Sequence, residues 1–175
     1  MAPAPMKYNE DGSVNWGDMW DTFCVLAQEG GPPHRETMLE APVTPDPTDP
    51  RYAEVVAEIS RGIMEVSGLH THPAEPGWLA IECESPGHAL WLQRAIVQEN
   101  VQARAENNLL LVPVNQEFTL KGEIKNVITV VAKTTHYWTE HLQTELKRAA
   151  DTEVKLDYWI GRVRRLFGKA DARTV

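Results

Sequence analysis

The chain contains few cysteines: Cys24 and Cys83 are the only two among its 175 residues. Two cysteines cannot build the disulfide framework that stabilises small secreted domains, so that class of protein is excluded. Both residues lie in apolar stretches, and we interpret them as small buried hydrophobic side chains. A chain of this length can bury a core of its own without such cross-links.

Long apolar runs are also absent. No run approaches the roughly 18 residues that a membrane-spanning helix requires. The first five residues lack the basic start and the apolar stretch that characterise a secretory leader. We therefore expect no membrane span and a cytoplasmic location.

The sequence lacks the short motifs that indicate common enzyme classes and nucleotide-binding sites. It has no GxSxG, HExxH or paired CxxC motif, no P-loop and no dinucleotide-binding glycine pattern. Its formal net charge of −8 at pH 7 argues against general binding of nucleic acid. Function must therefore be sought in the fold and in surface features.

The strongest structural signal covers residues 77–114. Residues 77–85 read as a strand, and Ser85 followed by Pro86 predicts the start of a helix that runs to about residue 100. Apolar and polar residues alternate over residues 101–106, and residues 109–114 are apolar. Asn107 and Asn108 between these two segments form a plausible turn, so the sequence predicts a hairpin. Strand, helix and strand predict a parallel pair, and the hairpin adds an antiparallel third strand.

A long helix is predicted over residues 119–149. At about 1.5 Å per residue it would span about 45 Å, longer than a small sheet needs. We therefore expect either a break near Thr134 and Thr135 or packing of the far half on another element. Ile81 and Trp138 should be buried together where this helix covers the sheet.

The remaining segments complete an α+β domain. Its small mixed sheet should be covered on one face by helices over residues 52–67, 86–100 and the first half of 119–149. We expect four parts: an N-terminal hairpin around Asp11 and Gly12 with a helix over 18–28 (1–40), a proline-rich linker or strap (41–50), the α+β core (51–150), and a C-terminal basic amphipathic helix over 154–168 with a tail (151–175).

Charge is divided unevenly along the chain. Residues 1–120 hold 6 basic and 18 acidic side chains, whereas residues 121–175 hold 11 basic and 7 acidic ones. The basic C-terminal helices either pack beside the acidic body or form a surface for a partner. For the surface, we identify interface candidates in the aromatic and basic residues of the last two helices: His136, Tyr137, His141, Trp159, Arg162 and Arg165.

Histidine provides the candidate metal ligands. His70 and His72 follow a predicted helix end at Gly68 and could reach one divalent transition metal such as zinc. His136 and His141 are five residues apart, about 140° around an α-helix, so His136 and Glu140 are the better-facing pair. No spacing supplies a third and a fourth ligand, and hydrogen-bonded or solvated histidines are the simpler interpretation.

A second candidate is an anion site in the loop of Gly30, Gly31, His34 and Arg35. Glycines allow main-chain N–H groups to converge on an anion, and arginine can bind phosphate or carboxylate with two hydrogen bonds. The simpler interpretation is a helix end followed by a rigid turn. If a small-ligand site exists, we expect it where this loop meets the loop of His70 and His72.

Two hypotheses about function follow. The first is a non-enzymatic cytoplasmic binding or assembly protein that acts through protein–protein contacts, with a homodimer or another protein as partner and no cofactor. The alternative is a small metal- or anion-binding protein, with or without enzymatic activity, that uses His34, Arg35, His70 and His72.

Overall fold

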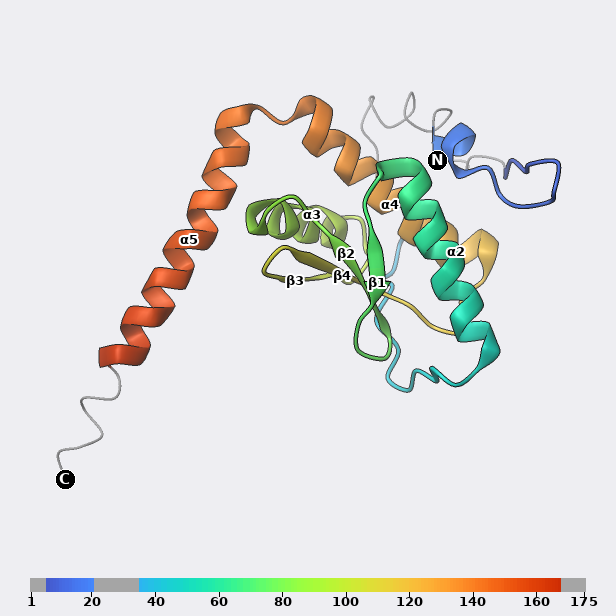
Figure 1. The fold of residues 1–175 in the computed structure, drawn as a ribbon, viewed down its shortest axis with the longest axis horizontal. Coiled ribbons are helices and arrows are strands. Elements are labelled where there is room, and N and C mark those ends of the chain that lie inside the picture. Colours follow the sequence, from blue (N-terminus) through green and yellow to red (C-terminus); the bar gives the residue numbers. More distant parts are fainter. Residues whose placement is uncertain (1–5, 21–34, 168–175) are drawn as a thin grey trace.

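The computed structural model describes residues 6–20 and 35–167, with side chains up to residue 157. The chain forms a four-stranded sheet with helices against it (Figure 1). The elements are α2 (Pro50–Ser67), β1 (Thr71–Pro73), β2 (Trp78–Glu82), α3 (Pro86–Gln98), β3 (Arg104–Glu106), β4 (Leu109–Pro113), the π-helical turn η1 (Leu120–Ile124), α4 (Lys125–His136), the π-helical turn η2 (Tyr137–His141) and α5 (Thr144–Phe167).

The α+β class predicted from the sequence is confirmed, but the strand order differs from the prediction. The order is β1-β2-β4-β3, and every pair of neighbouring strands is antiparallel. Strands β2 and β3 point the same way, yet β4 lies between them, so the predicted parallel pair is wrong. The wholly apolar β4 is buried most completely in a central position, with hydrogen-bonded neighbours on both sides.

The caps predicted for two helices are present. Asp49 accepts a hydrogen bond from the N–H of Arg51 (2.8 Å) at the start of α2. Ser85 accepts one from the N–H of His88 (3.1 Å) at the start of α3. In both helices proline occupies the first turn, where its missing N–H costs no internal hydrogen bond. Side-chain caps of this kind contribute about 1 kcal/mol each.

The main core lies between one face of the sheet and helices α2, α3 and α4, as predicted (Figure 1). Leu79 and Ile81 of β2 pair with Val112 and Leu110 of β4, and these four side chains point to the same face. Each is fully or almost fully buried. Burial of such a side chain contributes about 1.5–3 kcal/mol, which makes this layer the main source of stability.

The opposite face of the sheet is covered by the proline-rich segment. Trp78, Ala80 and Leu111 form a small second cluster against Ala41. The segment is held to the domain by side-chain amides: Gln102 Oε1 accepts from the N–H of Ala41 (2.7 Å), and a similar bond joins Gln116 to residue 46. The segment is therefore a strap across the surface.

Cys83 and the N-terminal hairpin also agree with the sequence predictions. Cys83 is buried, and burial raises the pKa of its thiol to about 12, so it is an inert hydrophobic residue here. Tyr8 bridges to Val14 around Gly12, whose φ is +83°. A helix starts at Trp16, two residues before the predicted start; its predicted remainder and Cys24 lie outside the described residues.

The predicted long helix is interrupted, but not at Thr134 and Thr135. The break comes at Leu142, whose ψ of 124° is extended, and a new helix, α5, begins at Thr144. The C-terminal helix predicted from residue 154 is the second half of α5, so the expected boundary at residues 150 and 151 falls inside a helix. The break turns the chain so that α5 crosses α3 instead of running past the sheet (Figure 1).

Among the described residues, none of the helices has both the length and the apolar composition that a membrane crossing requires.

The predicted contact between Ile81 and Trp138 needs correction. Both side chains are buried, but Trp138 (3% exposed) packs on α3: its ring stacks on His88 with centroids 4.6 Å apart and meets Trp91 at 5.6 Å. The reason is that Trp138 belongs to η2, beyond the end of the part of the helix that covers the sheet.

Replacement of Trp138 tests this packing. Trp138→Ala should lower the free energy of unfolding by about 3–5 kcal/mol, the usual cost of deleting a large buried aromatic side chain. The matched control is Tyr137→Ala, because Tyr137 is adjacent but 52% exposed. Chemical denaturation should show a loss below about 1 kcal/mol for the control; equal losses for both variants would contradict the packing.

Candidate docking site at the junction of helices α3 and α5

The junction begins with the sequence Ser85, Pro86, Gly87 and His88 at the start of α3. Asp151 of α5 is placed directly over this helix end. Its Oδ1 accepts hydrogen bonds from the hydroxyl of Ser85 (2.6 Å) and from the N–H of Gly87 (3.0 Å). A carboxylate is favoured at a helix N-terminus because the unpaired N–H groups carry partial positive charge. Asp151 therefore acts as an additional cap, supplied from 64 residues further along the chain.

Gly87 allows the two helices to approach this closely. A β-carbon at position 87 would lie 2.5 Å from the main-chain nitrogen of Asp151 and 2.8 Å from the main-chain carbon of Ala150. Real β-carbons do not tolerate such distances to backbone atoms, so α5 would have to shift. The crossing of α3 and α5 thus depends on a residue without a side chain.

A second polar contact sets the direction of α5. Arg94 of α3 donates two hydrogen bonds to the carboxylate of Glu153, at 3.1 and 2.8 Å. The hydrogen bonds from Arg94 hold the pKa of Glu153 below its usual range. Both side chains are largely exposed, so water screens the pair and it orients α5 more than it stabilises the fold.

Aromatic rings line the side of the junction formed by η2. Trp91 stacks on Tyr137 with parallel rings 5.9 Å apart, and Tyr137 meets His141 at 5.6 Å. His141 in turn meets His136 at 5.2 Å. Together with the stack of Trp138, these rings form a continuous aromatic cluster from the buried start of α3 to the surface.

The π-helical turn explains why His136 and His141 are neighbours. From the sequence we expected them to point about 140° apart, and that expectation is wrong. In a π-helix the hydrogen bond spans five residues, as in the bond from the N–H of Leu142 to the oxygen of Tyr137 (3.0 Å). Residues five apart therefore lie one above the other.

His88 is the buried titratable group of the junction. It is 1% exposed, and burial lowers its pKa to about 4; nearby Lys147 lowers it further, whereas Glu84 and Asp151 act in the opposite direction. Its Nδ1 accepts a hydrogen bond from the N–H of Glu84 (3.3 Å), which places the ring proton on Nε2. Nε2 has no hydrogen-bond partner among the described residues.

Ser85, His88 and Asp151 have the residue types of a hydrolase triad but a different arrangement. The hydroxyl of Ser85 donates to Asp151 and accepts from the main-chain N–H of His88. In a triad that hydroxyl would instead donate to the imidazole, which would act as the base. The three residues fix one helix on another, and we assign them a structural role.

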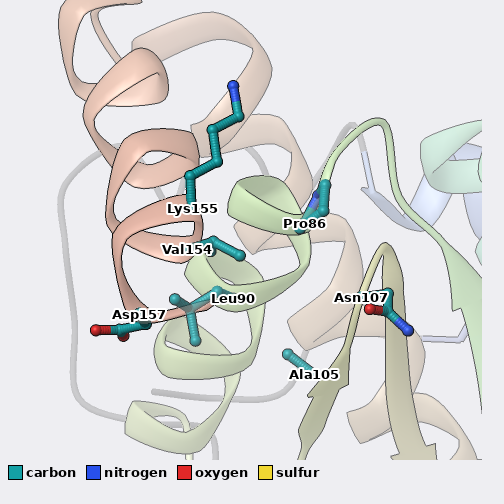
Figure 2. Close-up of a pocket in the computed structure, with 7 residues that line it drawn as sticks. All are labelled: Pro86, Leu90, Ala105, Asn107, Val154, Lys155 and Asp157. Atoms are coloured by element: carbon teal, nitrogen blue, oxygen red, sulfur yellow. The ribbon is translucent and has the colours of Figure 1, made fainter. Parts of the chain in front are cut away.

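A groove of about 450 Å³ opens beside the crossing, between α3, α5 and the β3–β4 hairpin. Its lining residues are Pro86, Leu90, Ala105, Asn107, Val154, Lys155 and Asp157. Figure 2 shows Val154 beside Leu90, with Pro86, Ala105 and Asn107 across from them. The polar ends of Lys155 and Asp157 point away from that space. The groove is thus mainly apolar, as pockets that bind ligands commonly are.

The structure brings together part of the predicted interface. His136, Tyr137 and His141 lie in one cluster at η2. Positions 159, 162 and 165 belong to α5 as predicted, although the side chains of Trp159, Arg162 and Arg165 lie outside the described ones.

His70 and His72, the predicted metal ligands, lie at β1, which is an edge strand of the sheet. His70 and His72 are exposed, and Nδ1 of His72 lies 3.4 Å from Oε1 of Glu82. Over the part of the chain that the structure describes, no group of three or more histidine, cysteine or acidic residues could hold a metal ion. A zinc site at these residues stays a prediction.

The predicted anion site falls mostly outside the described residues. Gly30, Gly31 and His34 belong to that part of the chain. The main-chain oxygen of Arg35 accepts a hydrogen bond from Asn100 (2.7 Å), just after α3, whereas His70 and His72 lie at β1. The anion site therefore also stays a prediction.

Sequence reasoning missed Gly87, Arg94, Asp151 and Glu153, which hold α5 in place. One signal was available: a glycine in the first turn of an otherwise well-formed helix often marks a close approach of another backbone. The partner of that glycine could not be read from the sequence, because the helix break at Leu142 was not predicted.

Comparison of this chain with protein-family models, with curated proteins and with solved structures found no match.

Substitution of Gly87 tests the crossing. Gly87→Ala should loosen α5 from α3, because overpacking costs about 1–3 kcal/mol. Protection of α5 amides against hydrogen exchange should therefore fall roughly 10- to 100-fold. The control is Gly17→Ala, another helical position, where the nearest atom to an added β-carbon, Oε1 of Glu65, would lie 3.5 Å away. Unchanged protection of α5 in Gly87→Ala would contradict the crossing.

The depressed pKa of His88 predicts a defined loss of stability in acid. His88 is ordinarily protonated below pH 6.5 in the unfolded chain but only below about pH 4 in the folded one. The contribution of His88 to the free energy of unfolding is therefore constant above about pH 6.5. As pH falls below that value, His88 lowers the free energy of unfolding, by about 3 kcal/mol at pH 4.

The measurement is the free energy of unfolding between pH 7 and pH 4 for the native chain and for His88→Gln, which cannot be protonated. The difference between the two curves should change by about 3 kcal/mol over this range. Parallel curves would show that His88 titrates normally.

Proposed function

We propose that this chain is a non-enzymatic binding or assembly protein that acts through protein–protein contacts, with α5 as its docking element. The observation that carries the proposal is the exposure of Leu156, which is 59% exposed on the side of α5 that faces away from the domain. A leucine at that place buries little surface against the domain, and with the apolar positions that follow it in the sequence it suits a contact with another protein.

The two sides of α5 can be separated from the helix geometry. Ala150, Asp151 and Val154 face α3, through the close approach to Gly87 and the groove beside Leu90. At about 100° per residue, position 156 lies about 120–160° around the helix axis from those three positions. The outward side of α5 is therefore distinct from its docked side.

The outward side continues beyond Leu156. Positions 159, 160, 163 and 167 lie within about 60° of position 156 around the axis, and the sequence has Trp, Ile, Val and Phe there. We call positions 156, 159, 160, 163 and 167 the outer stripe. A 24-residue helix is about 36 Å long, and its second half extends past α3 and the β3–β4 hairpin (Figure 1).

Charge also supports a docking role for this half of the helix. Residues 158–167 include three arginines and no acidic residue, in contrast to the acidic first 120 residues. An apolar stripe with basic flanks favours binding to a protein surface that has an apolar groove and acidic edges. The partner is either a second copy of the chain or a different protein.

The proposal is tested by substitution in the outer stripe. Leu156→Asp should abolish association of the chain with its partner, because a charge would have to be buried in the contact. Leu146→Asp is the matched control, since Leu146 is also exposed (54%) and lies on α5, about 80° around the axis from Leu156.

The measurement is chemical cross-linking of the tagged full-length chain in the cells that produce it, followed by identification of peptides joined to Lys147 or Lys155. Intermolecular cross-links, to the chain itself or to another protein, should form with the native chain and with Leu146→Asp but not with Leu156→Asp. Equal cross-linking of all three chains, or none with the native chain, would contradict the proposal.

A further inference from the structure

We infer that the pocket between the end of α2 and the junction of α4 with η2 binds a primary ammonium group on a short carbon chain. The pocket lies where α2 packs beside α4 (Figure 1) and has a volume of about 180 Å³. At about 30 Å³ for each water-sized group, it has room for about six such groups. Its lining residues are Trp20, Glu65, Val66, Ser67, Gly68, Thr135, His136 and Thr139. None of these belongs to α5, so the site is independent of the docking function proposed for that helix.

The end of α2 supplies hydrogen-bond acceptors to the pocket. Gly68 ends the helix with a φ of +69°, and its N–H donates to the oxygen of Met64. Among the described residues, no hydrogen bond reaches the main-chain oxygens of Glu65, Val66 and Ser67. The last oxygens of a helix carry partial negative charge, and the last turn of α2 has no basic residue to offset it. The helix end therefore favours a cation that donates hydrogen bonds.

The carboxylate of Glu65 adds negative charge to the pocket. Arg61 is shared between two carboxylates: Nη1 lies 2.9 Å from Oε2 of Glu65, and Nη2 lies 2.7 Å from Oε1 of Glu58. One positive and two negative groups leave this cluster negative. Neither a lysine nor an arginine is among the described residues that line the pocket, so its charge favours a cation over an anion. Trp20 also lines the pocket, and indole rings attract ligand cations that approach their faces.

Two threonines complete the pocket on the side of α4 and η2. The hydroxyl of Thr139 donates to the main-chain oxygens of Thr135 and His136, each 3.1 Å away, so its own oxygen can still accept a hydrogen bond. Thr135 is only 5% exposed, and its Oγ1 has no hydrogen-bond partner within the described part of the chain. Buried hydroxyl groups nearly always have a partner. A ligand that donates a hydrogen bond to Oγ1 would supply one.

This set of groups favours an ammonium group over a metal ion. An ammonium group has three donors and no acceptor, which matches a site made of oxygens. Over the described residues, no group of three or more histidine, cysteine or acidic side chains could hold a metal ion. The side chains of Trp20 and Val66 give the pocket apolar surface for a short carbon chain. A free amine and the end of a lysine side chain from another protein share this chemistry.

The test is titration of the purified full-length chain with butylammonium, followed through the amide shifts in NMR spectra. Amides of residues 66–68 and 135–139 should shift and saturate, with a Kd of about 1 mM for a ligand of so few atoms. Butanol is the matched control ligand, because it has the same carbon chain and no charge, and it should not saturate these shifts. Equal affinity for butanol, or no shift of these amides with butylammonium, would overturn the inference.

Two variants test the groups that line the pocket. Thr135→Val keeps the shape of the side chain but removes the unpartnered hydroxyl, so it should weaken butylammonium binding about three- to tenfold. Glu65→Gln keeps an acceptor for the N–H of Gly17 but removes the charge, and it should weaken binding about tenfold.

Thr134→Val is the matched control variant. Thr134 is also 5% exposed, but its hydroxyl donates to the oxygen of Val130 (2.8 Å), and it does not line the pocket. Its affinity for butylammonium should equal that of the native chain, and the amide spectrum of each variant establishes that it is folded. Equal affinity in the native chain and all three variants would contradict the site.

A lysine derivative distinguishes the two sources of the ammonium group. Nα-acetyl-lysine methylamide carries the same butylammonium group on a peptide backbone. Binding at least as tight as that of butylammonium would indicate a lysine of a protein partner as the occupant, whereas binding of butylammonium alone would indicate a free amine. Failure of both ligands to bind would exclude the ammonium site and leave the docking function of α5 unaffected.

Discussion

The carboxylate of Asp151 over the first turn of α3 is the interaction on which the arrangement of the C-terminal region depends. It accepts hydrogen bonds from the hydroxyl of Ser85 and the N–H of Gly87, and it lies at the positive end of a helix. The absence of a side chain at Gly87 lets the backbones meet there. Because a helix is rigid, this one contact, with the pair of Arg94 and Glu153, determines which side of α5 faces the domain and which faces outward.

Much of the domain could be predicted from the sequence because its signals are local. Two helix starts were predicted from a capping residue followed by proline, at Asp49 with Pro50 and at Ser85 with Pro86. The hairpin was predicted from the asparagines at 107 and 108. The strand order could not be predicted in the same way. Insertion of β4 between β2 and β3 depends on which strand gains most from burial on both sides, a tertiary effect that periodicity does not reveal.

The candidate site was predicted only in part. The aromatic and histidine residues at 136, 137 and 141 were recognised, but their mutual contacts were not, because the π-helical turn changes which residues face one another. The contact of Asp151 with α3 joins residues that are 64 positions apart, and no local sequence pattern predicts such a pair. Arg35, His70 and His72 were chosen by residue type, and the structure places Arg35 beside Asn100, after α3, and the two histidines at β1.

We propose different partners for the two halves of α5: the first half packs on its own α3, and the second half would pack on another molecule. The most direct test is hydrogen exchange of the chain alone and of the cross-linked species isolated with it. Amides of residues 147–154 should be protected equally in both samples, whereas amides of residues 158–166 should gain protection in the cross-linked species. Equal protection of residues 158–166 in both samples would contradict the account, as would protection of residues 147–154 only in the cross-linked species.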